Sequence, residues 1–349
     1  MKRVWVFLLT IVLIFTVGCQ GKKSEAETNT GDETEKIEIG MSFDSFVIER
    51  WQRDRDVFVS TAKELGATVN VQNASGDIEK QKEQIDYFIK KNVDVIVVIC
   101  IDSDSLIESV NKAKDAGIKV IAYDRLVTNS NADLYITFDN KKVGTLMAEA
   151  LADSGLKGKK ILMLGGSPTD NNVPLVESGF RIECASNSMS IVDSIHCEGW
   201  RAELAAEYIY SHEENVQKAD AIMCGNDNLA GQVISALSEK RLAGNILVVG
   251  QDADLEACQR IVEGTQLMTV YKPVEMLARR AAECAIMLAN GEEITGSDVT
   301  TINDGSYVIP YIGLEPIAVN AENMDEVIIK TGFHLKEDVY LNASDKMPE

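Results

Sequence analysis

Residues 93–124 read VDVIVVICIDSDSLIESVNKAKDAGIKVIAYD, and this stretch decides the fold. It holds two apolar runs, VDVIVVICI and KVIAYD, with a helical pattern between them near Asp104–Ala116. Short strands that alternate with helices predict βα units and a parallel sheet. Strands of such a sheet are buried on both faces, which explains why these runs are almost continuously apolar.

The same alternation extends in both directions from this stretch. Before it come KIEIGMSF, a helical pattern near Glu49–Leu65, TVNVQNA and a second helical pattern near Ile78–Lys91. After Leu134–Asp139 a second series begins, in which helical patterns separate KKILMLGG, SIVDSIHC, ADAIMCGND, NILVVGQD and MTVYKP. Two tandem βα series in 349 residues predict an α/β protein with two doubly wound parallel-sheet lobes and a cleft between them.

The long helical pattern at Val274–Asn290 does not begin a third series, so we expect the chain to return there to the first lobe. Crossings near Phe138, Thr269 and Asn303 would then form a three-stranded hinge. The predicted parts are a first lobe of residues 37–138 with 271–303, a second lobe of 139–270 with 304–334, and a C-terminal tail of 335–349.

The N-terminal residues predict secretion. Residues 1–18 have a basic start and an apolar run that is shorter than the about 20 residues needed to cross a membrane. Thr16-Val17-Gly18-Cys19 resembles a bacterial lipobox, which implies a lipoprotein signal peptide and a lipid on Cys19; an uncleaved membrane anchor is the alternative. Residues 19–36 are polar and predict a flexible tether. We therefore expect a protein held by lipid at the extracytoplasmic face of the cell membrane.

Charge and cysteine content exclude some functions. The net charge of −21 argues against nucleic acid as a partner. None of the seven cysteines has the CxxC spacing of a zinc or redox site, so we expect no metal and no cofactor. Cys184 and Cys197 would pair only if their strands were adjacent, and buried free cysteine is the commoner state.

Polar residues follow many of the predicted strands at their carboxyl ends, where open parallel sheets bind ligands. They are Asp44, Asp124-Arg125, Asp139-Asn140, Asp170-Asn171-Asn172, Asn226-Asp227 and Asp252. A single Asp or Asn is often only a helix cap or a turn residue. Several of them together with arginine and lysine favour a polyol-binding site.

Six stretches carry a family resemblance: IERWQRDRDVF (48–58), KVIAYDR (119–125), FDNKKVG (138–144), LGGSPTDNN (164–172), GQDADL (250–255) and TVYKP (269–273). By their order and spacing, the chain from about Lys36 to His334 resembles the bacterial xylose-binding proteins of pentose and hexose ABC importers. FDNKKVG and Asn226-Asp227 are also similar to ribose-type binding proteins and lactose-repressor-type regulators. The resemblance implies a periplasmic-binding-protein type I fold that closes around a pentose, with D-xylose favoured over related monosaccharides.

The resemblance also implies a set of binding residues. Around the sugar hydroxyls it places Arg50, Asp124, Arg125, Asn171, Asn226, Asp252 and Lys272, with Asp139 and Asn172 as further candidates. For the apolar face of the sugar it implies the aromatic residues Phe43, Trp51 and Trp200. The chemistry fits, because hydroxyls both donate and accept, carboxylates accept, and arginine and lysine donate. An aromatic ring can cover the C–H face of a pyranose.

An enzyme is not expected. The three histidines, at 196, 212 and 334, lie in no catalytic motif, and Gly165-Gly166-Ser167 lacks a Walker or GxSxG context. A DNA-binding regulator of the same fold would need a helix-turn-helix where the signal peptide is predicted. Two roles stay open, namely delivery of the sugar to a membrane ABC permease and docking on a membrane sensor histidine kinase.

Overall fold

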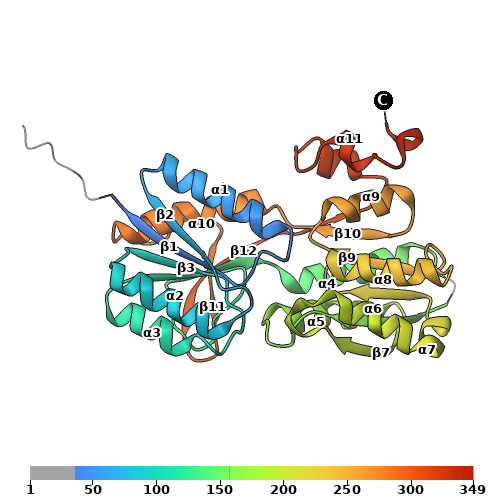
Figure 1. The fold of residues 1–349 in the computed structure, drawn as a ribbon, viewed down its shortest axis with the longest axis horizontal. Coiled ribbons are helices and arrows are strands. Elements are labelled where there is room, and N and C mark those ends of the chain that lie inside the picture. Colours follow the sequence, from blue (N-terminus) through green and yellow to red (C-terminus); the bar gives the residue numbers. More distant parts are fainter. Residues whose placement is uncertain (1–35, 157, 349) are drawn as a thin grey trace, which may run out of the picture. The chain divides into compact units, whose positions relative to one another are not determined.

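The computed structural model describes residues 36–156 and 158–348, so the predicted signal peptide and Cys19 lie outside the described residues. The described part contains two parallel sheets, each covered by helices (Figure 1). This confirms the predicted α/β class with two doubly wound lobes.

The first lobe has a seven-stranded sheet in the order β11-β12-β5-β4-β3-β1-β2. Its strands are β1 (Glu38–Phe43), β2 (Thr68–Asn73), β3 (Val95–Val98), β4 (Lys119–Tyr123), β5 (Leu134–Phe138), β11 (Val299–Asn303) and β12 (Val308–Leu314). All neighbours are parallel except the edge pair β11 and β12. The carboxyl ends of β1, β3 and β4 therefore lie at one edge of the sheet.

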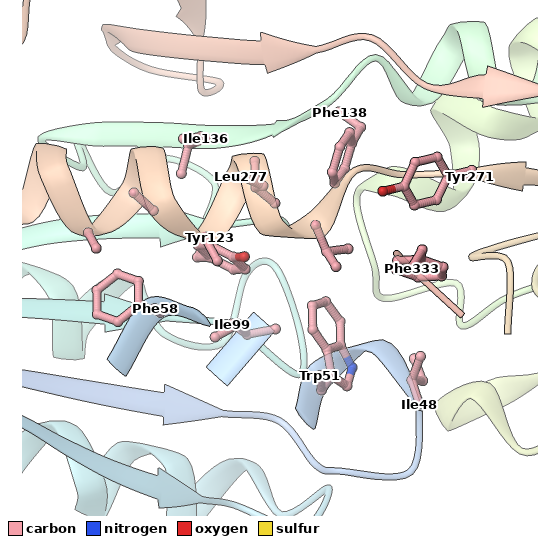
Figure 2. Packing of buried hydrophobic residues seen from close by; sticks show 14 of the residues in the cluster. Ile48, Trp51, Phe58, Ile99, Tyr123, Ile136, Phe138, Tyr271, Leu277 and Phe333 are labelled. Atoms are coloured by element: carbon pink, nitrogen blue, oxygen red, sulfur yellow. The ribbon is translucent and has the colours of Figure 1, made fainter. Parts of the chain in front are cut away.

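Helices cover both faces of this sheet. They are α1 (Arg50–Glu64), α2 (Ile78–Lys91), α3 (Ile107–Asp115) and α10 (Val274–Ala289). Phe58 of α1 and Leu277 of α10 pack with Ile121 of β4 in one apolar core, part of which is shown in Figure 2. Phe88 of α2 and Val110 of α3 belong to the separate core on the opposite face. The alternating side chains of the strands supply both cores.

The second lobe has a six-stranded sheet in the order β13-β10-β9-β8-β6-β7. Its strands are β6 (Lys160–Gly165), β7 (Ser190–His196), β8 (Ala221–Cys224), β9 (Leu247–Gln251), β10 (Met268–Tyr271) and β13 (Ile317–Val319). Only β13 runs antiparallel to its neighbour, β10. Its helices are α4 (Asn140–Asp153), α5 (Asn172–Ser186), α6 (Ala202–Ser211), α7 (Glu213–Lys218), α8 (Asp227–Glu239) and α9 (Leu255–Glu263), and Glu198–Trp200 form a 3₁₀ turn.

The chain crosses between the sheets after β5, after β10 and after β12. The first two crossings lie close to the predicted positions at Phe138 and Thr269. The third was expected near Asn303, but β12 pairs with β5 of the first sheet, so the crossing comes only after Leu314. The prediction that residues from 304 onward belong to the second lobe is therefore wrong for β12.

The C-terminal segment, defined here as residues 320–348, packs on the second lobe. It contains a π-helical turn at Asp325–Ile329, α11 (Lys336–Val339) and a 3₁₀ turn at Ser344–Lys346. Val339 and Tyr340 are buried in the core that also contains Cys258 of α9. The predicted tail is thus a docked part of the lobe.

Cys184 and Cys197 are both free and buried. Cys184 belongs to the core that α4 and α5 share, whereas Cys197 belongs to the core under α6 and α8, so the two thiols lie in different cores. Across residues 36–156 and 158–348, no helix is long and apolar enough to cross a membrane. The same residues contain no group of acidic, histidine or cysteine side chains arranged to hold a metal ion.

Candidate functional site

A pocket lies between the two lobes at the carboxyl ends of their strands, where the open-sheet rule predicts a ligand. The first lobe contributes Ile48, Arg50, Trp51, Asp124 and Arg125. The second lobe and the crossing after β10 contribute Gly165, Gly166, Asp170, Asn172, Val173, Val176, Glu177, Trp200, Met223, Gly225, Asn226, Gln251, Asp252 and Lys272. Polar and charged groups face apolar side chains, as in small-molecule sites.

Arg50 and Asp124 form one buried ion pair of the pocket. Arg50 lies in the first turn of α1, and its Nη1 is 2.8 Å from Asp124 Oδ2. The same guanidinium binds Asp54 one turn later, at 2.9 Å, and lies over the Trp51 ring at 4.4 Å. Burial alone would raise the pKa of Asp124, but Arg50, Lys272 and Arg125 outweigh it and hold this pKa below its usual range. Asp124 is therefore an ionised acceptor.

Arg125 connects the two lobes. Its Nη1 lies 2.7 Å from Asp44 of the first lobe, and its Nε lies 2.7 Å from Asp170 of the second. Asn172 adds a second connection, because its Nδ2 donates to the backbone carbonyl of Asp124 at 3.0 Å. Asp170 also accepts from Trp200 Nε1 at 3.2 Å. The charged groups of both lobes thus form one network when the lobes are together.

The second-lobe wall contains Asp252, Lys272 and Trp200. Asp252 follows β9, Lys272 follows β10, and Asp252 Oδ1 lies 3.2 Å from Lys272 Nζ. A Cβ at Gly166 would overlap the indole of Trp200, so only glycine lets this ring lie against the wall. Asp124, Trp200 and Asp252 all have positive φ, at 63°, 58° and 101°. Such backbone strain outside glycine concentrates at functional sites.

Two polar atoms of the pocket, Trp51 Nε1 and Gln251 Oε1, are buried without a hydrogen-bond partner among the described residues, whereas Asp252 Oδ1 has the Lys272 ammonium group 3.2 Å away. A buried donor or acceptor that stays unpaired costs about 1–3 kcal/mol, and most such groups in proteins are paired. One unpaired donor and one unpaired acceptor, beside the ion-paired carboxylate of Asp252, fit a ligand whose groups both donate and accept.

The charges of the pocket are balanced. Each of its three cations, Arg50, Arg125 and Lys272, lies within 3.2 Å of an aspartate oxygen, and the side chains of all three are at most 6% exposed. An anionic ligand would find no unpaired positive charge among them. This arrangement favours a neutral, hydroxyl-rich ligand.

Nine of the twelve residues predicted from sequence line this pocket: Arg50, Trp51, Asp124, Arg125, Asn172, Trp200, Asn226, Asp252 and Lys272. The structure places the other three elsewhere. Phe43 is buried in the first core, with its ring centroid 6.3 Å from that of Trp51. Asp139 is exposed and caps α4 by accepting from Lys142 N at 2.9 Å. Asn171 donates its backbone N–H to Ser103 Oγ of the first lobe at 3.1 Å.

The sequence reasoning missed Asp170, Gln251 and Glu177 as pocket residues. Asp170 begins the polar run Asp170-Asn171-Asn172, and Gln251 directly precedes Asp252, so the strand-end signal included both positions. Glu177 lies within α5, where the sequence carries no comparable signal.

Asp227 is a buried acid behind the pocket, and it predicts a pH dependence of stability. Its Oδ2 accepts from Thr269 Oγ1 at 2.6 Å, and its Oδ1 accepts from Gln266 Nε2 at 2.8 Å. Burial raises the pKa of Asp227 to about 7. The folded protein therefore binds more protons than the unfolded chain between pH ~4 and ~7, so the Asp227 contribution to stability falls as pH rises through that window.

We expect Asp227→Asn to make the unfolding free energy less dependent on pH between 5 and 8, because asparagine has no proton to lose. Urea unfolding of both proteins at several pH values measures this. Desolvation also raises the pKa of the half-buried Asp254 beside Asp227, so a residual slope is expected in the variant. Equal slopes in the two proteins would contradict the prediction.

Comparison with known proteins agrees with this architecture. Residues 39–293 match the model of the periplasmic binding protein domain family. The D-xylose-binding periplasmic protein of Escherichia coli (strain K12) is 43% identical over 317 residues, which cover 89% of this chain and 95% of that protein. The protein of the same name from Haemophilus influenzae is 43% identical over 309 residues, which cover 87% and 92%.

Among solved structures, an ABC transporter solute-binding protein from Clostridium phytofermentans with bound β-D-glucose superimposes with a TM-score of 0.77. It is 28% identical, and the match covers 86% of this chain and 99% of that one. The predicted resemblance and type I fold are confirmed, as is the prediction of a binding protein rather than an enzyme. The chain belongs to the periplasmic binding protein family.

Proposed function

We propose that this protein binds a neutral monosaccharide, most specifically D-xylose, in the pocket between its lobes. The main support for the proposal is the pair of unpartnered polar atoms, Trp51 Nε1 and Gln251 Oε1, in a pocket whose charges are balanced. One sugar hydroxyl can accept from the indole, and others can donate to Gln251 Oε1 and to the Asp252 carboxylate. The choice of D-xylose is supported by the 43% identity to two proteins named for binding it.

Binding acts by closing the lobes. Arg50, Trp51 and Asp124 come from the first lobe, whereas Asn226, Gln251 and Asp252 come from the second. Only the closed arrangement offers both sets to one ligand, and this differential affinity lets the ligand shift the equilibrium toward closure. A shift from 1:99 to 99:1 would take about 5.5 kcal/mol.

The closed, loaded protein delivers its sugar to the permease of an ABC importer while a lipid on Cys19 holds it at the extracytoplasmic membrane face. Sugar uptake by cells that lack the protein tests this role. Loss of uptake supports delivery, whereas unchanged uptake with a lost transcriptional response to the sugar would favour docking on a sensor histidine kinase.

D-Xylose is expected to raise the melting temperature of the purified protein by several degrees. A ligand that binds only the folded state at about 100 times its Kd adds about 2.7 kcal/mol of stability. Thermal unfolding with a panel of pentoses, hexoses and a sugar phosphate measures the effect. A shift with ribose or glucose but none with xylose would refute the choice of sugar, and a shift with the sugar phosphate alone would refute a neutral ligand.

Cys19→Ser is expected to release the full-length protein from the membrane fraction, because it removes the proposed site of lipid attachment. A single acyl chain already gives marginal membrane binding, and the multiple chains of a lipoprotein give stable anchoring. Fractionation followed by immunoblotting measures the change. A variant that stays in the membrane fraction with its signal peptide attached would show that an uncleaved segment is the anchor.

A further inference from the structure

His334, in the C-terminal segment, touches the turn that carries Asp252. The His334 side chain is buried, and its Nε2 lies 2.8 Å from the backbone carbonyl of Ala253. A carbonyl can only accept, so the ring must carry its proton on Nε2 and donate it. His334 is 81 residues further along the chain, so the contact links the C-terminal segment to the wall of the pocket.

The turn at Asp252-Ala253 needs such support. Both residues have positive φ, 101° at Asp252 and 55° at Ala253, a region that is unfavourable for residues with a Cβ. Asp252 N donates to the carbonyl of Val270 at 2.8 Å, and Ala253 N donates to Thr269 Oγ1 at 3.1 Å. These bonds hold the amide groups of the turn to β10. The Ala253 carbonyl has a weak contact of 3.6 Å with Cys258 Sγ, and the histidine supplies its strong bond.

The C-terminal segment holds His334 in place. The preceding Phe333 packs edge-on against Tyr271, with ring centroids 4.7 Å apart (Figure 2). The Arg53 guanidinium of α1 lies over the Phe333 ring at 4.1 Å. Farther along, the carbonyl of Asp338 accepts from Gln259 of α9 at 2.8 Å. The chain is therefore anchored on both sides of His334, which a positioning role requires.

We propose that His334 is a positioning residue for ligand binding: its Nε2–H holds the Ala253 carbonyl and thereby the left-handed turn that directs the Asp252 carboxylate into the pocket. The inference rests on the proposed function, because it assigns Asp252 to the ligand. His334 itself does not line the pocket. His334 should therefore affect the affinity only by positioning the Asp252 carboxylate.

The test compares donating and non-donating side chains at position 334. His334→Leu fills a similar volume but cannot donate a hydrogen bond. We expect it to raise the Kd for D-xylose about five- to tenfold, which corresponds to the loss of one hydrogen bond. His334→Gln can donate through its amide, so its Kd should stay within about threefold of the unaltered protein. Asn342→Ala is the matched control, because it removes a 3.0 Å bond to Glu263 from the same segment without touching Ala253. Its Kd should not change.

Calorimetric titration well below the melting temperature measures these values on proteins shown to be folded by circular dichroism. His334→Ala serves as a second non-donating variant if the leucine variant does not fold. A double-mutant cycle with Asp252→Asn then separates positioning from general loosening. In the Asp252→Asn background, the further rise in Kd caused by the non-donating variant should fall to about twofold or less.

The role of His334 would be overturned if a non-donating variant bound D-xylose with unchanged affinity. It would also be overturned if such a variant raised the Kd as much in the Asp252→Asn background as in the unaltered protein. Either result would leave the proposed function intact, because the unaltered protein would still bind D-xylose. Failure of the unaltered protein to bind any sugar would instead overturn the proposed function, and the inference with it.

Discussion

Arg125→Met is expected to weaken sugar binding by roughly two to three orders of magnitude, because removal of one partner from a buried ion pair costs about 3–5 kcal/mol. Arg125 is 3% exposed and lies 2.7 Å from both Asp44 and Asp170. Without it, closure would bury the carboxylates of Asp44 and Asp170 without the cation that lies between them. In an open protein water can solvate them, so the cost falls on closure and therefore on the Kd. Calorimetric titration with D-xylose measures the loss.

Arg280→Met is the control for the loss of an arginine as such. Arg280 also forms an ion pair with an aspartate, Asp298, at 2.8 Å, but within the first lobe and away from the pocket. Its replacement should leave the Kd unchanged. If Arg125→Met binds the sugar as tightly as Arg280→Met does, the charged network between the lobes does not support the closed, loaded form.

Asp252→Asn is expected to raise the Kd about 10- to 100-fold. The substitution keeps the shape of the side chain, and asparagine tolerates positive φ, so the turn should survive. It removes a charged acceptor, and hydrogen bonds to charged groups are worth about 1.5–3 kcal/mol. It also leaves Lys272, 3.2 Å away, without its carboxylate. The same titration measures the change, with the melting temperature as a check on folding.

Asp139→Asn is the matched control for this carboxylate. Both aspartates follow a strand, and both were predicted as ligands, but Asp139 is exposed and caps α4. Asparagine is as good a cap as aspartate, so neither stability nor affinity should change appreciably. An affinity loss at Asp139 equal to that at Asp252 would mean that the ligand lies elsewhere.

The order of strands and helices could be predicted because apolar period and length distinguish buried strands from helices. The position of the third crossing between the two sheets could not be predicted. The pattern of residues 299–314 fits a hairpin, and the Asp304 carboxylate accepts from the amides of Ser306 and Tyr307 in its turn. Nothing in that pattern shows which sheet the hairpin joins, because that depends on the pairing of β12 with β5.

The strand-end pattern pointed to Asp124, Arg125 and Asp252, and all three line the pocket between the lobes. The pattern could not give the direction of single side chains. Asn171 precedes α5 while Asn172 begins it, and one residue turns a helical side chain by about 100°. Asn172 therefore lines the pocket and Asn171 does not. No sequence pattern resolves a difference of one residue at a helix start.

A crystal structure of the protein grown with D-xylose would show directly whether the sugar bridges the two lobes. We expect one sugar between the lobes, with its hydroxyls within hydrogen-bond distance of Asp124 from the first lobe and of Asp252 and Gln251 from the second, and with Trp51 Nε1 paired. A sugar that contacts only one lobe, or one bound outside the pocket while Trp51 Nε1 and Gln251 Oε1 stay unpaired, would contradict the proposed site.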